Sequence, residues 1–337
     1  MRIVVLDDIG IGAEDLQRLE QKGDVRVFSG SPHGLDEIVE RARGAEVVIS
    51  GWTKIDGRVL AALPGLQLVS LWATGLDNVD LAAAHAHDVV VSHVPSYAAN
   101  AVAELALGLM LAVLRKIPAA DQHLRRSGQA EWQPFQGGEL HGKRLGVVGT
   151  GVIGQRVAQV GRCLGMSLLG YDLQPSQAMI DELGMRYMTL SQLFTDSDVV
   201  TLHAPLTPDT QDLVDGALLR RLPETAIIIN TARAGLIRQD DLLEALREKS
   251  IAGAGLDVID LSLESGAGLL ALDNVVATPH IGFYTREALA NLTAVCVDNV
   301  VGFLEGAPAN VAALPPAPSD PQSAGAGAPN EEENSGI

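Results

Sequence analysis

The sequence predicts an α/β protein built from parallel sheets, and three observations support this class. Short apolar runs without polar alternation, such as residues 3–6 and 46–50, recur along the chain. Runs of this kind are typical of parallel strands that are covered on both faces. Segments with helical spacing, such as residues 239–249, separate the runs and serve as crossovers. The 337 residues, 47% of them hydrophobic, are enough for about two domains with sizeable cores.

The apolar runs give the expected strands in chain order: 3–6, 46–50, 67–71, 144–148, 167–171, 198–202, 226–229 and 274–277. Two helical segments are longer than ordinary crossovers. Residues 100–116 are apolar on most sides, which indicates a helix buried between other elements. Residues 285–305 end in the stop signal Gly306-Ala-Pro308.

A block with its own alternation of strands and helices lies between these two long helices. We therefore predict a discontinuous first domain, residues 1–100 plus 286–311, with a second domain, residues 101–285, inserted into it. Residues 312–337 consist mainly of Pro, Ala, Gly, Ser and Glu, which cannot bury enough apolar surface to order themselves. This last segment is predicted to be a disordered tail.

Composition narrows the partners and the compartment. The chain has 42 acidic and 24 basic residues, a net charge of −18, which disfavours nucleic acid and anionic membranes as partners. Two cysteines, Cys163 and Cys296, fit a reducing compartment. The first residues lack a signal peptide, and the apolar residues 101–114 are too short to span a bilayer. We expect a cytoplasmic protein, and the histidines show no spacing that predicts a metal site.

A glycine motif predicts a dinucleotide site. Gly149, Gly151 and Gly154 follow the strand at 144–148 and open a helix near Val152. The first glycine permits a tight turn, the second lets a pyrophosphate approach, and the third lets the helix pack closely on the strand. The phosphates then lie at the helix N-terminus. Asp172, 18 residues after Gly154, suits a ribose diol and would repel a 2′-phosphate, which favours NAD over NADP.

Beyond this motif, the chain resembles the D-2-hydroxyacid dehydrogenase family over about residues 3–311. The segments that carry the resemblance are LWATGLDNVD at 71–80, ELHGKRLGVV at 139–148, HAPLT at 203–207, NTARAG at 230–235, GAGLDV at 253–258 and TPHIGFY at 278–284. The resemblance implies two Rossmann-like domains, the discontinuous one binding substrate, with the active-site cleft between them. It also implies hydride transfer between NAD(H) and a small 2-oxo acid or D-2-hydroxy acid.

The resemblance also implies the roles of individual residues. Arg233 would hold the substrate carboxylate and carbonyl, because its planar fork of donors suits them. His280 would move the proton, because its ordinary pKa lies near cellular pH. The expected substrate contacts are Ala73, Thr74, Gly75, Tyr97 and Arg233. The expected cofactor contacts are Gly149, Gly151, Val152, Ile153, Gly154, Asp172, His203, Ala204, Pro205, Thr210, Thr231, Ala232, Arg233, Asp257, His280 and Gly282.

One position departs from the family. A glutamate that pairs with the catalytic histidine is expected between Arg233 and His280, and Ser262 stands in its place. Three interpretations follow. Glu264 or Asp260 reaches the imidazole instead; Ser262 itself hydrogen-bonds the ring, which would shift activity toward acid pH; or the 2-oxo acid reaction is lost or changed.

Two other functions therefore stay open at this stage. One is a non-catalytic NAD(H)-sensing interaction protein on the same fold, and the other is a dehydrogenase for an atypical oxyanion such as a phosphonate. By resemblance we also expect a homodimer, to which the apolar residues 101–115 would contribute. The sequence leaves open the substrate side chain, the physiological direction, and what replaces the glutamate.

Overall fold

The computed structural model describes residues 1–312 and divides the chain into two compact units. Unit 1 holds residues 1–93 and the chain from Cys296, and unit 2 holds residues 94–295. The first unit is discontinuous, as in the prediction, but both divisions fall elsewhere, after residue 93 and after residue 295. The difference arises because α5 (Ala99–Leu114) and the first half of α13 (Arg286–Leu304) count with unit 2. The predicted tail, apart from Ala312, lies outside the described residues.

Unit 1 contains a five-stranded sheet whose strands are all parallel. Its order is β2 (Asp24–Val27), β1 (Arg2–Val5), β3 (Val47–Ser50), β4 (Leu68–Leu71) and β5 (Val90–Ser92). One face packs on α2 (Gly34–Arg41), α3 (Gly57–Ala62) and α4 (Leu81–Ala86). The other elements of this unit are α1 (Ala13–Glu20) and the end of α13. An ion pair between Arg18 of α1 and Asp298 of α13 joins these two helices.

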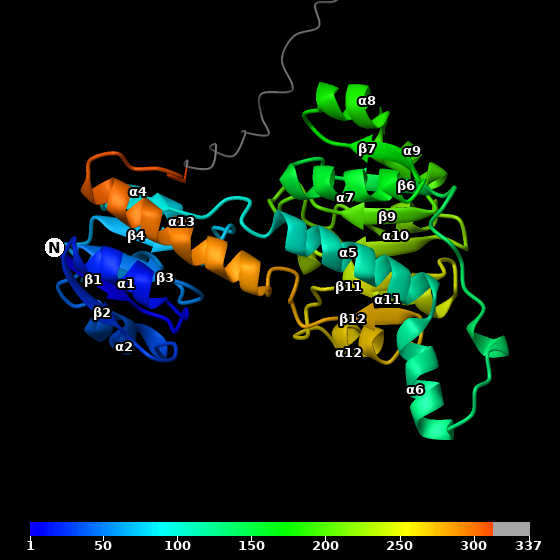
Figure 1. The fold of residues 1–337 in the computed structure, drawn as a ribbon, viewed down its shortest axis with the longest axis horizontal. Coiled ribbons are helices and arrows are strands. Elements are labelled where there is room, and N and C mark those ends of the chain that lie inside the picture. The colour runs from blue at the N-terminus through cyan, green and yellow to red at the C-terminus, as the bar shows by residue number, and fades with distance from the viewer. Residues whose placement is uncertain (313–337) are drawn as a thin grey trace, which may run out of the picture. The chain divides into compact units, whose positions relative to one another are not determined.

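Unit 2 contains a seven-stranded parallel sheet (Figure 1). Its order is β12 (Val275–Ala277), β11 (Gly253–Leu256), β10 (Ile227–Asn230), β9 (Val199–Leu202), β6 (Arg144–Val148), β7 (Ser167–Tyr171) and β8 (Arg186–Tyr187). One apolar cluster joins the sheet to α5, α7 (Val152–Cys163) and α8 (Gln177–Leu183). The two parallel sheets confirm the predicted α/β class.

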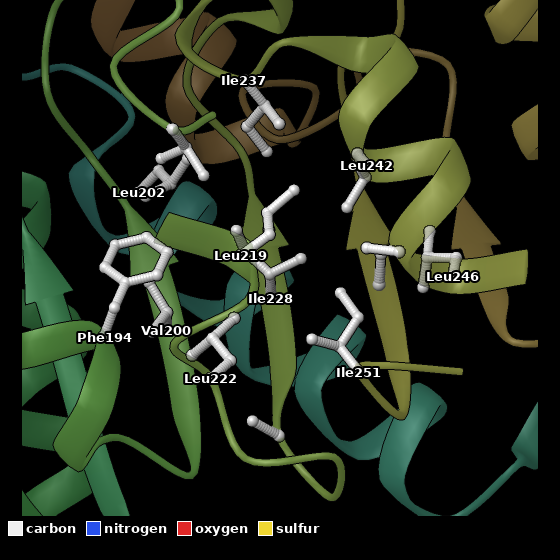
Figure 2. Packing of buried hydrophobic residues seen from close by; sticks show 14 of the residues in the cluster. Phe194, Val200, Leu202, Leu219, Leu222, Ile228, Ile237, Leu242, Leu246 and Ile251 are labelled. Atoms are coloured by element: carbon white, nitrogen blue, oxygen red, sulfur yellow. The ribbon is translucent and has the colours of Figure 1, made fainter. Parts of the chain in front are cut away.

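The opposite face of this sheet carries α9 (Leu190–Asp196), α10 (Gly216–Leu219), α11 (Gln239–Arg247) and α12 (Glu264–Leu270). Figure 2 shows the cluster beneath them, in which Phe194 of α9 and Leu242 of α11 meet Val200 and Ile228 of the sheet. Burying one such side chain contributes roughly 1.5–3 kcal/mol. This apolar packing holds the strand ends in fixed positions, and the candidate site is built on those ends.

The long apolar helices differ in detail from expectation. Residues 100–116 were expected to form one helix, but α5 ends at Leu114 and Lys116 adopts a left-handed φ of 51°. A separate helix, α6 (Ile117–Ser127), then begins with Pro118 in its first turn. By length and composition α13 could cross a membrane, but Leu292, Cys296 and Val300 on it are fully buried, which is typical of a core helix.

Candidate active site

The predicted site residues of unit 2 follow the carboxyl ends of neighbouring strands. In sheet order these are His280 after β12, Asp257 after β11, Thr231 and Arg233 after β10, His203 after β9, Gly149 after β6 and Asp172 after β7. Parallel strands present their carboxyl ends at one edge of the sheet. The strand order changes direction between β6 and β9, and such a switch point is where open α/β sheets bind ligands. The fold therefore gathers the predicted residues along one edge.

The glycine loop has the geometry that a pyrophosphate needs. Gly149 adopts a φ of +87°, and a Cβ there would lie 2.6 Å from Ala204 N. A Cβ on Gly154 would overlap the carbonyl oxygen of Gly149. A Cβ on Gly151 would meet nothing within 4 Å, and among the described residues no side chain caps the N-terminus of α7. The backbone N–H groups at this terminus are thus left for an anion.

Asp172 is held by donors from the same loop. Its Oδ2 accepts hydrogen bonds from Thr150 N at 2.6 Å and Thr150 Oγ1 at 3.0 Å, and its Oδ1 accepts one from Gln174 N at 2.9 Å. Tyr187 OH in turn donates to Thr150 Oγ1 at 2.9 Å. Burial raises the pKa of Asp172, but these hydrogen bonds outweigh it and hold the pKa below its ordinary value. Asp172 is therefore a carboxylate at neutral pH.

The loop after β9 contains His203, Ala204, Pro205 and Thr210. Burial lowers the pKa of His203 to about 3, and its neutral ring shares a hydrogen bond of 2.9 Å with Thr201 Oγ1. Thr210 Oγ1 donates to Pro205 O at 2.7 Å and accepts from Thr207 N at 2.7 Å. Thr210 thus fixes the shape of the loop, and the tightly packed backbone of Ala204 faces Gly149.

Arg233 is positioned by Asn230 at the end of β10. The Asn230 side chain donates to Arg233 O at 2.8 Å and accepts from Ala232 N at 3.0 Å. The neighbouring Thr231 is 7% exposed, and its hydroxyl finds no hydrogen-bond partner among the described residues. A bound polar group or a water molecule would satisfy a buried hydroxyl of this kind. Together with the open space at Gly151, it indicates that the edge fits a dinucleotide.

Tyr97 lies near Arg233 within unit 2. Burial raises the pKa of Tyr97 to about 12, and the Arg233 guanidinium partly opposes this rise. Its ring packs with Phe283 on the cluster formed by Ala98, Val102 and Ala288. The two predicted substrate contacts of this unit, Tyr97 and Arg233, are therefore neighbours, and the phenol is neutral at physiological pH.

His280 lies on an exposed loop whose backbone is hydrogen-bonded to Asp257. Its φ is +57°, a left-handed conformation that costs a non-glycine residue about 1 kcal/mol or more. Its backbone N donates to Asp257 O at 2.9 Å. The ring lies edge-on to Phe283, with centroids 5.9 Å apart and planes at 86°. Within residues 1–312 the imidazole forms no hydrogen bond or ion pair.

Two of the three candidates for a partner of His280 engage other groups, and the third is exposed. Ser262 donates from N and Oγ to Asp260 Oδ1, at 2.9 and 2.6 Å. Asp260 N donates to Gln239 Oε1 at 2.9 Å, and Glu264 is exposed in the first turn of α12. Hydrogen bonds from Ser262 lower the pKa of Asp260. In the described part of the chain, none of the three is bonded to the imidazole.

The predicted substrate loop of unit 1, Ala73–Gly75, follows β4. Thr74 O accepts a hydrogen bond of 2.9 Å from His93 Nδ1, and Trp72 before the loop is buried. The Trp72 ring lies edge-on to the half-exposed ring of Trp52, with centroids 5.7 Å apart. Asp7 is fully buried and fixes the turn that carries Trp52, because it accepts from Gly51 N at 2.8 Å and Thr53 Oγ1 at 2.7 Å.

Four residues that organise the site were not predicted from the sequence: Thr150, Tyr187, Asn230 and Thr278. Thr150 and Asn230 lie inside motifs that were recognised, so their place in the motif was a usable signal. Thr278 likewise opens the recognised segment 278–284, whereas Tyr187 carries no such signal, because it reaches Thr150 only through the folded sheet.

Comparison with known proteins agrees with this geometry. Residues 107–282 match the family described as D-isomer specific 2-hydroxyacid dehydrogenase, NAD binding domain. The chain is 37% identical to a glycerate dehydrogenase of Methylorubrum extorquens over 82% of this chain and 88% of that protein. It is 35% identical to a D-3-phosphoglycerate dehydrogenase of Methanocaldococcus jannaschii over 95% of this chain, but spans only 61% of that protein.

Solved structures show the same fold. An acyclic imino acid reductase in complex with NADPH and D-Arg superposes with a TM-score of 0.86 at 28% identity, covering 93% of this chain and all of that one. The TT0316 protein from Thermus thermophilus superposes with a TM-score of 0.85 at 35% identity over 93% of this chain and all of that one.

Proposed function

Because this chain belongs to the D-isomer specific 2-hydroxyacid dehydrogenase family and is an NAD(H)-binding oxidoreductase, we propose that it interconverts a small 2-oxo acid and the D-2-hydroxy acid, with His280 moving the proton and Arg233 holding the substrate. The observation that carries the proposal is the common sheet edge of unit 2. There the glycine loop, Arg233 and His280 follow β6, β10 and β12. The two outer strands of this set are four strand spacings, or roughly 19 Å, apart.

The glycine loop and its neighbours would hold the cofactor along this edge. The α7 N-terminus at Gly151, Val152 and Ile153 would bind the pyrophosphate, and Asp172 the adenosine ribose. The loop at His203–Pro205 would line the adenine and ribose side. The orphan hydroxyl of Thr231, together with Ala232, Asp257 and Gly282, would line the nicotinamide end. Bound NADH supplies the hydride. We propose NADH over NADPH, because the Asp172 carboxylate would repel a 2′-phosphate.

Arg233 and His280 would divide the work on the substrate. The Arg233 fork binds the carboxylate and polarises the carbonyl oxygen, which lysine could not do with the same geometry. Negative charge develops on that oxygen as hydride arrives, and the His280 imidazolium donates its proton to it. In the reverse direction the neutral imidazole takes the hydroxyl proton. Tyr97, neutral and next to Arg233, would contact the substrate as a hydrogen-bond donor.

Small acids such as glyoxylate, hydroxypyruvate and pyruvate are the proposed substrates. The loop Ala73–Gly75 of unit 1 would bind the substrate carboxylate through its backbone amides. The similarity to a glycerate dehydrogenase supports hydroxypyruvate, since oxidation of glycerate at C2 gives that acid.

The test is NADH oxidation with these three acids, with NADH binding measured separately by fluorescence. Turnover that His280→Gln abolishes while NADH still binds would support the proposal. NADH binding without turnover on any acid would favour the non-catalytic, NAD(H)-sensing alternative instead.

A second candidate substrate is the imine of a 2-oxo acid. The observation that favours it is the His280 imidazole, which no carboxylate contacts in the described part of the chain. A protonated imine already carries the proton that a carbonyl oxygen must receive during reduction. Reduction of the imine therefore depends less on a general acid. The fold similarity to an acyclic imino acid reductase agrees with this chemistry. Turnover that appears only when ammonium or an amine accompanies the 2-oxo acid would establish it.

We propose a homodimer in solution. The support comes from α6 and the residues after it, where Ile117, Leu124 and Trp132 are between 52% and 76% exposed. Large exposed apolar side chains on one segment are typical of an interface. Analytical ultracentrifugation at micromolar concentration should show twice the chain mass of 35.4 kDa. A species at the chain mass would contradict the proposal.

A further inference from the structure

The segment Thr278–Gly282 is tied to a single buried residue, Asp257. Thr278 Oγ1 donates to Asp257 Oδ1 at 2.6 Å, and Ile281 N donates to the same oxygen at 2.9 Å. Gly282 N donates to Oδ2 at 2.8 Å. With the bond from His280 N to Asp257 O, one residue therefore accepts hydrogen bonds from both sides of His280.

The surroundings of Asp257 make this arrangement specific. The residue is 1% exposed, and its own N donates to Asn230 O at 2.9 Å, which ties it to β10. A Cβ on Gly282 would lie 2.9 Å from Asp257 Oδ2, so only glycine allows this close approach. A buried carboxylate needs donors to offset its lost hydration. Here those donors come from the loop that carries His280.

We propose that Asp257 is a positioning residue, whose buried carboxylate holds His280 in its left-handed conformation and so aims an imidazole that no carboxylate contacts within residues 1–312. This inference rests on the proposed role of His280 in proton transfer. Strained backbone conformations persist only where the surroundings over-determine them, and the three carboxylate bonds supply that constraint. Phe283 lies against the imidazole edge and limits the rotation of the ring. The imidazole is therefore oriented by the hydrogen bonds between Asp257 and the loop, and not by a side chain at position 262.

A matched pair at Thr278 tests the proposal without touching a predicted cofactor contact. Thr278→Val removes one carboxylate donor at nearly constant volume, and Thr278→Ser keeps the hydroxyl. The first readout is amide hydrogen exchange of residues 278–284 in the full chain, which needs no activity. We expect exchange to rise on the order of tenfold in Thr278→Val and to stay near wild type in Thr278→Ser, with residues 199–202 of β9 unchanged as an internal control.

The second readout separates positioning from cofactor binding. For Thr278→Val we expect kcat to fall about tenfold, with recovery in Thr278→Ser and with the Kd for NADH within twofold of wild type in both. In Asp257→Asn the side-chain amide would face an N–H donor. If this variant folds, its amide exchange should rise more, and its kcat should fall further, than in Thr278→Val. An unchanged exchange rate in Thr278→Val, or a Kd for NADH that rises while kcat holds, would overturn the proposal. If wild type turns over none of the acids, the exchange result still decides whether Asp257 holds the loop.

Discussion

Thr150 and Asp172 are joined twice: the backbone N and the side-chain hydroxyl of Thr150 both donate to Asp172 Oδ2, at 2.6 and 3.0 Å. The carboxylate is therefore fixed beside the glycine loop. The same contacts lower its pKa, despite the opposing effect of burial, so that it stays ionised at neutral pH.

Cofactor preference should follow this carboxylate. Asp172→Asn removes the charge that would repel a 2′-phosphate, so the Kd for NADPH should fall and the Kd for NADH should rise, each about tenfold. Tyr187→Phe removes the hydroxyl that donates to Thr150 Oγ1 and accepts from Ser176 N, and it should shift the ratio of the two Kd values about twofold to fivefold in the same direction. Fluorescence titration with both cofactors measures this. Tighter binding of NADPH than NADH by wild type would contradict the assignment of NAD.

The glycines of the loop should separate folding from binding. Gly151→Ala places its Cβ in open space, so unfolding free energy should change by less than about 0.5 kcal/mol while NADH affinity falls on the order of tenfold. Gly154→Ala overlaps Gly149 O and should destabilise the fold by more than about 1 kcal/mol. Urea unfolding and NADH titration of both variants provide the test. Undiminished NADH affinity in Gly151→Ala would place the pyrophosphate elsewhere.

The pair Arg144–Asp198 should make stability depend on acid pH. Burial raises the pKa of Asp198, but hydrogen bonds from Arg144 and its charge outweigh it and lower the pKa below 3.8. The stabilisation is therefore present above pH 3.8 and is lost as the pH falls through the lower value of the folded state. Asp198→Asn should cost about 1 kcal/mol at pH 7 in urea unfolding, and the gap should close in acid.

A matched control lies on the same arginine. Asp196 approaches Arg144 Nη1 only at 4.0 Å and is half-exposed, so Asp196→Asn should leave stability nearly unchanged. An equal loss in both variants, or a gap for Asp198→Asn that does not narrow as the pH is lowered, would show that charge pairing is not the cause.

Position 262 should matter little to the reaction as it stands. Ser262 bonds to Asp260 and not to the imidazole, so Ser262→Ala should keep kcat within about twofold of wild type across the neutral pH range. Ser262→Glu adds a carboxylate at the family position, and activity extending to higher pH would show that this side chain reaches His280. A large loss of kcat in Ser262→Ala would instead support the interpretation that Ser262 hydrogen-bonds the His280 imidazole.

Arg233 should not be replaceable by lysine. Arg233→Lys keeps the charge but loses the planar fork, so kcat/KM should fall by about 10- to 100-fold, while NADH affinity changes far less. Steady-state kinetics with hydroxypyruvate would show this. An unchanged kcat/KM in Arg233→Lys would indicate that another residue binds the substrate carboxylate.

Much of the fold was accessible from the sequence because apolar runs mark the buried strands. The eight predicted runs correspond to β1, β3, β4, β6, β7, β9, β10 and β12. The four strands β2, β5, β8 and β11 were not predicted. The edge strand β2 gave no signal because Asp24–Val27 is largely exposed and alternates polar with apolar residues. The break between α5 and α6 was also not predicted, because Lys116 adopts a left-handed conformation and no glycine marks that position in the sequence.

The candidate site was predictable where motifs fix the backbone and unpredictable where tertiary contacts choose the partner. Gly149 follows β6, Gly154 lies in the first turn of α7, and Arg233 follows β10, as their motifs imply. Asp257 was expected as a cofactor contact, and nothing in the sequence joins it to Thr278, 21 residues away, until β11 and β12 pair. The contact of Ser262 with Asp260 is likewise a local hydrogen-bond choice that spacing does not reveal.

The most direct test of the proposed mechanism is NADH oxidation by wild type and His280→Gln with glyoxylate, hydroxypyruvate and pyruvate across acid, neutral and alkaline pH, with the Kd for NADH measured on both proteins. We expect turnover by wild type, a loss of about 100-fold or more in His280→Gln, and equal NADH affinity. Equal turnover in the two proteins, or tight NADH binding with no turnover in either, would contradict this mechanism.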